Sequence, residues 1–161
     1  MIEEVAQAFG GLAQGDDGRL HRAGSLGDAS CLSFYPTKNL GGVGDAGAAA
    51  FRDSAHRTHT TSLRNHGYSE HGHDAAGLNN RMDELHAVFL KAGLDDIEVT
   101  LDRRLVIARQ YLEALAGVGW VALPDSTTGH AWNYFVIRHP RRDALAEMLS
   151  DQKVTTRFYY P

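Results

Sequence analysis

The spacing of apolar residues predicts helices in the second half of the chain. Apolar side chains recur at helical intervals between Asp83 and Leu94, at Leu85, Val88 and Phe89. After a charged stretch, a second run with the same spacing ends before Gly117, a helix stop signal, and consists of Leu101, Leu105, Ala108, Leu112 and Leu115. Pro140 occupies a typical first helical position, and the helix that it opens should face inward with Leu145, Met148 and Leu149.

Two segments have the composition of β-strands. Residues 31–35 form a short apolar run that stops at Pro36, which predicts a buried strand leading into a turn. Residues 131–138 are aromatic and β-branched, and they predict a second strand. Residues 2–9 fit either the end of a strand or the start of a helix. Helices that follow strands in this way indicate an α/β or α+β protein.

The remaining segments have the composition of loops. Residues 10–29 are rich in Gly, Asp and Arg, so we expect a loop there. The segment from Gly41 to Gly47 has four glycines in seven residues, which indicates positive φ angles or a close approach of the backbone to another group. Residues 52–80 are polar and His-rich with little periodicity, and most of them are expected to be irregular.

Composition narrows the class of protein. The 161 residues are enough for one ordinary domain with a core, and 43% hydrophobic with 22% charged residues is typical of a globular chain. The formal net charge is −4, from 16 basic and 20 acidic residues. A surface that follows nucleic-acid phosphates usually needs a basic excess or a clustered basic stripe. The charge therefore argues against a nucleic-acid-binding protein.

The single cysteine and the lack of long apolar runs indicate a cellular compartment. Cys31 has no partner for an internal disulfide, which favours a reducing environment. The apolar runs are far shorter than the roughly 20 residues that cross a bilayer. The acidic N-terminus also lacks the layout of a secretory signal. The sequence therefore predicts a cytoplasmic location and no membrane partner.

Lys38 is a candidate nucleophile. It follows an apolar strand and a Pro turn, which would hold the amine at a fixed position where it can attack a carbonyl group. Ser33 precedes it and the glycine loop follows it, so a hydroxyl and several backbone N–H groups are available to an anion such as phosphate. A surface lysine in a turn is the simpler interpretation of the lysine alone.

Other candidate sites are weaker. Nine histidines include His71 and His73, which would share a metal ion, but their spacing fits no closed zinc pattern and cysteine partners are missing. Glu3 and Glu4 form a carboxylate pair, although neighbouring acids more often cap a helix start. Trp132 and Tyr134 alternate with apolar residues as in a packed strand, and Cys31 has the neighbours of a buried strand residue.

Several stretches match one known pattern together and in order. They are IEEVAQAFGG, GSLGDASCLSFYPTKNLGGVGDAGA, SLRNHG, GLNNRMDELHAVFL, RRLVIARQYLEAL and NYFVIR. The chain resembles the DegT/DnrJ/EryC1/StrS family of pyridoxal-phosphate-dependent nucleotide-sugar aminotransferases over nearly its whole length. The resemblance implies an α/β fold: part of the aspartate-aminotransferase-like large domain (fold type I) in residues 1–94, and the start of the small α+β domain in residues 95–161.

The resemblance also implies roles for single residues. Lys38 matches the lysine that binds the pyridoxal 5′-phosphate covalently and then moves a proton between the substrate and the cofactor. Ser33 matches a phosphate-binding hydroxyl, and Gln7 matches the glutamine beside the cofactor ring. Asn79 matches an asparagine that reaches the cofactor phosphate across a dimer interface, which implies a homodimer with shared active sites. Glu4 stands where the family carries the Asp that pairs with the ring nitrogen.

These matches lead to one main hypothesis and two alternatives. The main one is an aminotransferase that moves an amino group, from L-glutamate, to a nucleotide-linked keto sugar. Histidine replaces the lysine in dehydratases of this fold, so Lys38 indicates amine transfer. The stretch YPTKNLGGVGDAGA resembles members that act on 3-keto sugars. The alternatives are an inactive module of the same fold, favoured by Glu4, and a His-rich metal-binding module.

The chain departs from the family in length. Family members are more than twice as long, and the parts that would carry a phosphate loop and an aromatic residue stacked on the cofactor ring have no counterpart here. The segment between Gln7 and Gly24 is longer than in the family, and residues 52–62 match poorly. We therefore expect a piece of an aminotransferase that by itself binds the cofactor weakly or not at all.

Overall fold

The centre of the protein is a small sheet of three strands, seen in a computed structural model that describes residues 1–125 and 129–159. Strand β1 (Ile2–Glu4) pairs in parallel with β4 (Ala29–Ser33), which pairs antiparallel with β5 (Gly47–Phe51). Glu4 lies opposite Cys31 in the register. Residues 2–9 thus contain a strand end, and the strand predicted at 31–35 begins and ends two residues earlier.

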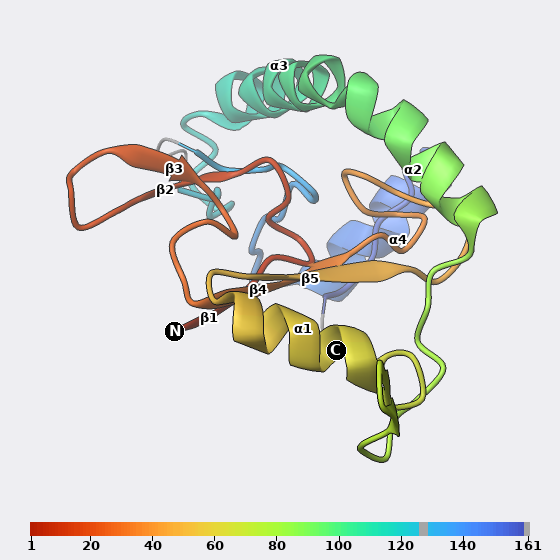
Figure 1. Ribbon diagram of the computed structural model, residues 1–161. Helices are drawn as coiled ribbons and strands as arrows, with labels where there is room; N and C mark the ends of the chain where they lie inside the picture. Colours follow the sequence, from red (N-terminus) through yellow and green to blue (C-terminus); the bar gives the residue numbers. More distant parts are fainter. Residues whose placement is uncertain (126–128, 160–161) are drawn as a thin grey trace.

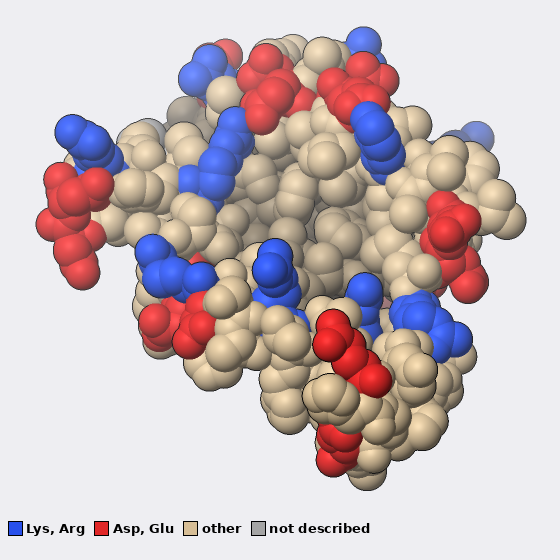
Figure 2. All heavy atoms as spheres, in the orientation of Figure 1, with Lys and Arg blue, Asp and Glu red and all other residues tan. Residues whose placement is uncertain are grey.

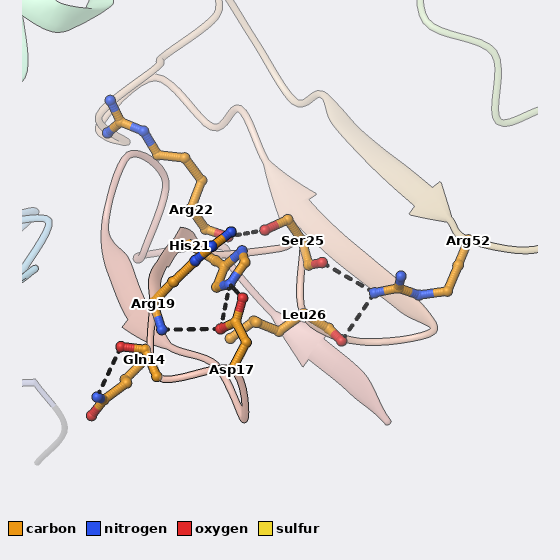
Figure 3. Close-up of polar contacts among 9 residues, drawn as sticks. Gln14, Asp17, Arg19, His21, Arg22, Ser25, Leu26 and Arg52 are labelled. Carbon is orange, nitrogen blue, oxygen red and sulfur yellow. Dashed lines mark hydrogen bonds and ion pairs between the residues drawn. The ribbon is translucent and has the colours of Figure 1, made fainter.

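Both segments predicted to be irregular contain regular elements. Residues 10–29 hold the antiparallel hairpin of β2 (Leu12–Gln14) and β3 (Leu20–Arg22). In its turn the carboxylate of Asp17 contacts the His21 ring at 2.9 Å, as Figure 3 shows. Short polar strands with this local cross-link give no alternating apolar signal, which explains why the hairpin was not predicted.

The His-rich segment also begins with a helix, which contradicts the prediction for residues 52–80. Helix α1 (Ser54–Leu63) starts at Asp53, whose side chain accepts the Ala55 N–H at 2.7 Å. The helix has no buried residue, so no apolar stripe marks it in the sequence. A two-residue hairpin of β6 (Tyr68–Ser69) and β7 (Gly72–His73) follows it.

The long helices agree closely with the predicted ones. Helix α2 (Glu84–Asp95) and helix α3 (Ile97–Leu115) follow each other at the charged stretch, and Gly117 adopts φ +80° just after the second. Figure 1 shows α2 and α3 as an arc above the sheet, with α1 below it. The residue that α2 buries is Leu90, whereas the apolar face of Leu85, Val88 and Phe89 is exposed.

Helix α4 (Arg142–Asp151) begins two residues after Pro140 and not at it. Leu145 and Leu149 are half-buried, whereas Met148 is exposed. The strand predicted at 131–138 is wrong: within these eight described residues, only Arg138 pairs in β fashion, with Ala122. A strand needs a neighbour along its length, and this segment packs instead through its side chains.

The core connects the first and second halves of the chain. Leu40, Leu90 and Ile97 form the buried cluster, and Phe9, Phe34, Ala46, Met82 and Leu101 pack against it. The predicted division of the chain between residues 94 and 95 falls one residue before the end of α2, and it stays a prediction. No helix within residues 1–125 and 129–159 is long and apolar enough to cross a membrane.

Candidate active site

A cleft of about 900 Å³ lies at one end of the sheet. The parallel strands β1 and β4 end there, and β5 begins there. The carboxyl ends of parallel strands are the usual place for ligands in α/β proteins. The side chains that line the cleft are Gln7, Ser33, Tyr35, Thr37, Lys38, Asp45, Asn79, Asn80, Arg81, Met82, Tyr134, Arg157 and Tyr159, beside Ala46 and Gly47. Four of the five predicted cofactor-binding residues are among them: Gln7, Ser33, Lys38 and Asn79.

Lys38 reaches the cleft from a tight turn. The Lys38 N–H donates to the Tyr35 carbonyl at 2.9 Å, and Pro36 lies at the second position of this β-turn, where its fixed φ is favoured. Lys38 is half-buried. Strand β4 therefore ends at Ser33 and the chain turns at once, which places the hydroxyl and the amine on the same cleft.

The glycine loop is explained by close backbone approach. A Cβ atom at Gly41 would overlap the Pro36 carbonyl, and one at Gly47 would lie 2.8 Å from the Leu32 carbonyl oxygen. A side chain at Gly41 would therefore displace the turn that carries Lys38. Of the two predicted alternatives, close approach is therefore the one that applies, since no glycine from Gly41 to Gly47 has a positive φ.

Glu4, the fifth predicted residue, does not line the cleft. It is exposed, and its Oε1 accepts the Ala6 N–H at 2.7 Å. Its neighbour Glu3 has a different role, because the Glu3 carboxylate accepts the backbone N–H groups of Gly24, Leu26 and Gly27. Both carboxylates therefore accept hydrogen bonds from backbone N–H groups, and neither one lines the cleft of Lys38.

Asn79 enters the cleft on a loop that is fixed by backbone pairing. Asn65 and Asn79 form an isolated antiparallel bridge, and the His66 N–H donates to the Leu78 carbonyl at 3.0 Å. Arg81 adds a hydrogen bond of 2.5 Å to the Asn65 Oδ1. Asn79 thus borders the cleft of its own chain, and a homodimer stays a prediction.

A second wall of the cleft comes from the C-terminal half and was missed by the sequence analysis. It carries Tyr134, Arg157 and Tyr159, and the two tyrosine rings stack with centroids 4.4 Å apart. Hydrogen bonding with Tyr159 is the main cause that lowers the pKa of Tyr134, and Thr37 and the charge of Lys38 act in the same direction. Tyr134 was interpreted as a packed strand residue, and no local signal in the sequence distinguishes the two roles.

The cleft has the donors that a phosphorylated aldehyde needs. Lys38 offers a primary amine, and hydroxyl, amide and guanidinium groups from Ser33, Asn79 and Arg81 suit a phosphate. Its volume lies in the usual range for cofactor sites. Pyridoxal phosphate therefore fits this donor set, although the carboxylate predicted to face its ring nitrogen lies outside the lining.

The structure gives no support to a histidine metal site. Within the described ranges, no three His, Cys, Asp or Glu side chains are close enough together to hold a metal ion. The His73 Nδ1 donates to the His66 carbonyl oxygen, 3.0 Å away, and the His73 ring packs edge-on against Tyr68. These contacts stabilise the small β6–β7 hairpin. Cys31, expected to be buried, is exposed on β4.

Comparison with known proteins decides the family. The sequence profile of the DegT/DnrJ/EryC1/StrS aminotransferase family matches residues 1–161. The chain belongs to this family. It is 37% identical to the erythromycin biosynthesis sensory transduction protein EryC1 of Saccharopolyspora erythraea, over 100% of this chain and 43% of that protein. It is 36% identical to the UDP-N-acetyl-3-dehydro-α-D-glucosamine 3-aminotransferase of Acidithiobacillus ferrooxidans, with the same two shares.

Solved structures give the same fold. DesV from S. venezuelae, determined with a ketimine intermediate, superimposes with a TM-score of 0.91 at 35% identity, over 99% of this chain and 43% of that one. The predicted fold, part of a type I pyridoxal-phosphate transferase, is therefore confirmed. The chain spans less than half the length of the relatives that it matches.

Proposed function

We propose that the protein transfers an amino group from L-glutamate to a nucleotide-linked keto sugar with pyridoxal 5′-phosphate as its cofactor. One observation carries the proposal: three separate segments, which carry Gln7, Ser33 with Lys38, and Asn79, line one cleft. Family membership supports the reaction class. When bound, pyridoxal phosphate supplies an electron sink for negative charge that develops on the substrate carbon.

Each of these cleft residues has a part in the proposed reaction. The Lys38 Nζ binds the cofactor aldehyde and, once released, carries a proton to and from the substrate carbon. Ser33 and Asn79 bind the phosphate, and Gln7 lies beside the ring. L-Glutamate gives up its amino group and leaves as the corresponding 2-oxo acid, and the amino group then replaces the carbonyl oxygen of the sugar.

The substrate proposal follows the relatives. The Acidithiobacillus protein is named for amination at C3 of a UDP-linked sugar, which supports a 3-keto sugar for this chain as well. A homodimer with shared active sites is part of the proposal through Asn79. The single cysteine supports work in a reducing cytoplasm.

An inactive member of the family is a second candidate, favoured by one observation. A carboxylate beside the ring nitrogen keeps it protonated, and Glu4 is exposed and bonded to the Ala6 N–H instead. In that case the cleft would bind the cofactor without passing on an amino group. The two candidates share Lys38 chemistry and differ in the response to L-glutamate.

The three lysines of the sequence, Lys38, Lys91 and Lys153, allow a direct test. The chain is incubated with pyridoxal 5′-phosphate, reduced with borohydride and digested, and the modified fraction of each lysine is measured by mass spectrometry. We expect Lys38 to be modified most, because the other two lie on exposed surfaces away from the cleft. Equal modification of all three lysines would contradict the proposed site.

Two comparisons refine this experiment. Pyridoxal without its phosphate should lose the preference for Lys38, and Ser33→Ala should reduce it, since both remove phosphate contacts. Lys91→Arg is the control, because Lys91 lies outside the cleft, and it should leave the modified fraction of Lys38 unchanged. Addition of L-glutamate before reduction separates the candidates: an aminotransferase releases Lys38 from modification, whereas an inactive module keeps it modified.

A further inference from the structure

Asn39, the residue after Lys38, lies at the junction of three segments. Its side chain is buried, with 7% of the residue exposed. The Asn39 Nδ2 donates to the Phe9 carbonyl at 3.0 Å and to the Ala131 carbonyl at 2.8 Å. Phe9 follows Gln7 closely, and Ala131 precedes Tyr134. One carboxamide therefore connects the turn of Lys38, the loop of Gln7 and the segment that leads to the second wall of the cleft.

The second wall rests on a segment that is held from several sides. The Leu12 N–H donates to the Gly129 carbonyl at 2.8 Å. Arg104, on helix α3, donates through Nη1 to the carbonyls of Trp132 and Asn133 at 3.2 and 3.3 Å. With the Asn39 bond, residues 129–133 are therefore fixed through their backbone carbonyls by three different elements.

The backbone of residues 129–133 is strained, and the hydrogen bonds to it hold the strained conformation. Trp132 has a φ of +48°, which is unfavourable for a residue with a large side chain, and it is only 7% exposed. A conformation of this kind persists where the surroundings enforce it. Asn39 binds the carbonyl before Trp132 and Arg104 binds its own carbonyl, so the two side chains enforce the strained bend from which Tyr134 enters the cleft.

The burial of Asn39 is itself costly. Its Oδ1 is buried and has no hydrogen-bond partner among the described residues, which an apolar side chain of the same size would avoid. Such a side chain would instead leave the Phe9 and Ala131 carbonyls without these donors. The amide is therefore needed for its two donated bonds and not for packing alone.

We propose that Asn39 is a positioning residue that holds the wall of Tyr134, Arg157 and Tyr159 across the cleft from Lys38. The inference rests on the proposed function, which identifies the cleft as the cofactor site. The tie, which is the pair of hydrogen bonds from Asn39 to the Phe9 and Ala131 carbonyls, is a property of the chain and is measurable without any ligand. Without it, Lys38 remains in its turn but faces a wall that is free to move away.

Two variants test the tie. Asn39→Leu removes both donors at nearly constant volume, and Asn39→Asp removes them at constant shape. Gln14→Glu is the matched control, since its amide donates to the Gly18 carbonyl at 3.2 Å in the β2–β3 hairpin, away from the cleft. Circular dichroism confirms that each variant is folded before the other readouts are compared.

The first readout is the emission of Trp132, measured in a Trp120→Phe background so that the second tryptophan of the sequence does not contribute. We expect a shift to longer wavelength in both Asn39 variants and none in Gln14→Glu, because release of the segment exposes Trp132 to water. Arg104→Met should give the same shift from the other side of the segment. An unchanged spectrum in Asn39→Leu would refute the tie.

The second readout is the preference of pyridoxal phosphate for Lys38 over Lys91 and Lys153. We expect it to fall about fivefold or more in folded Asn39→Leu, the effect of losing a typical buried hydrogen bond. Arg104→Met should lower it too, since it loosens the same wall. An unchanged preference in both variants would overturn the positioning role. If the parent chain shows no preference, the proposed function fails, and the Trp132 emission still decides the tie.

Discussion

The Glu3 carboxylate accepts the backbone N–H of Gly24 at 2.7 Å and thereby connects strand β1 to the loop that enters β4. The N–H groups of Leu26 and Gly27 donate to the same carboxylate. Arg52 reinforces this loop from β5 by donating to the Ser25 and Leu26 carbonyls, as Figure 3 shows. The bonds from Gly27 and then Gly24 are the main causes that lower the pKa of Glu3.

Glu3→Gln should therefore destabilise the fold at neutral pH, by about 1 kcal/mol for the loss of charge-assisted bonds. A carboxyl whose pKa is lowered on folding stabilises above its unfolded pKa, and the stabilisation disappears as the pH falls through the folded pKa. Urea unfolding at neutral and acidic pH measures this. The difference between parent and variant should shrink in acid. Glu147→Gln, on exposed α4, is the control, and a difference that persists in acid would contradict the assignment.

A glycine in the Asn79 loop should be essential for folding. Gly67 has φ +69°, and a Cβ there would overlap the Ala75 carbonyl oxygen. Gly67→Ala should cost about 3 kcal/mol or more, because the backbone must shift to relieve the overlap. Gly18 has a similar φ of +73° with nothing near its Cβ position, so Gly18→Ala isolates the conformational cost of about 1 kcal/mol. Equal losses in thermal unfolding would show that the overlap is relieved cheaply.

Leu40 connects the turn of Lys38 to the core. It is 5% exposed and packs in the cluster with Leu90 and Ile97. Leu40→Ala should lower the free energy of unfolding by about 2–5 kcal/mol, as for other buried leucines. Leu85→Ala, at a site that is 75% exposed on α2, should change it by less than about 0.5 kcal/mol. Denaturant titration of both variants would contradict this prediction if the two losses were alike.

The stacked tyrosines should titrate separately. Hydrogen bonding between the two rings lowers the pKa of Tyr134 and raises that of Tyr159. Phenolate absorbance followed from neutral to alkaline pH should therefore show an early step that Tyr134→Phe removes. Tyr68→Phe, in the β6–β7 hairpin, should leave the early step in place. If the early step survives in Tyr134→Phe, the pair is not coupled as described.

The sequence was sufficient for one wall of the cleft and not for the other. Ser33 lies in a strand and Lys38 follows a Pro turn, both of which local composition predicts, and Asn79 lies in a recognisable motif. Tyr134 follows a segment that Asn39 and Arg104 bind through hydrogen bonds between residues far apart in the chain. The local sequence pattern carries no information on such contacts. It also does not show whether a segment has a partner strand, which explains the wrong strand prediction at 131–138.

Two further differences have local causes. Helix α1 buries no residue fully, so its polar Thr- and His-rich sequence has no apolar stripe, and its Asp53 cap was the available signal. Glu4 was assigned from the family position alone, and its bond to the Ala6 N–H lies within two residues.

Figure 2 shows acidic and basic side chains interspersed around the hollowed face, in keeping with the small net charge.

The bond from Asn39 to Ala131 spans 92 residues of chain. Contacts of such separation form late in folding, because the entropy of closing a long loop is lost before the contact repays it. The β4–β5 pair and the helices depend on more local contacts, so we expect them to form earlier. We therefore expect the selectivity of Lys38 for an aldehyde to appear late in refolding, only once Asn39 and Ala131 have come into contact.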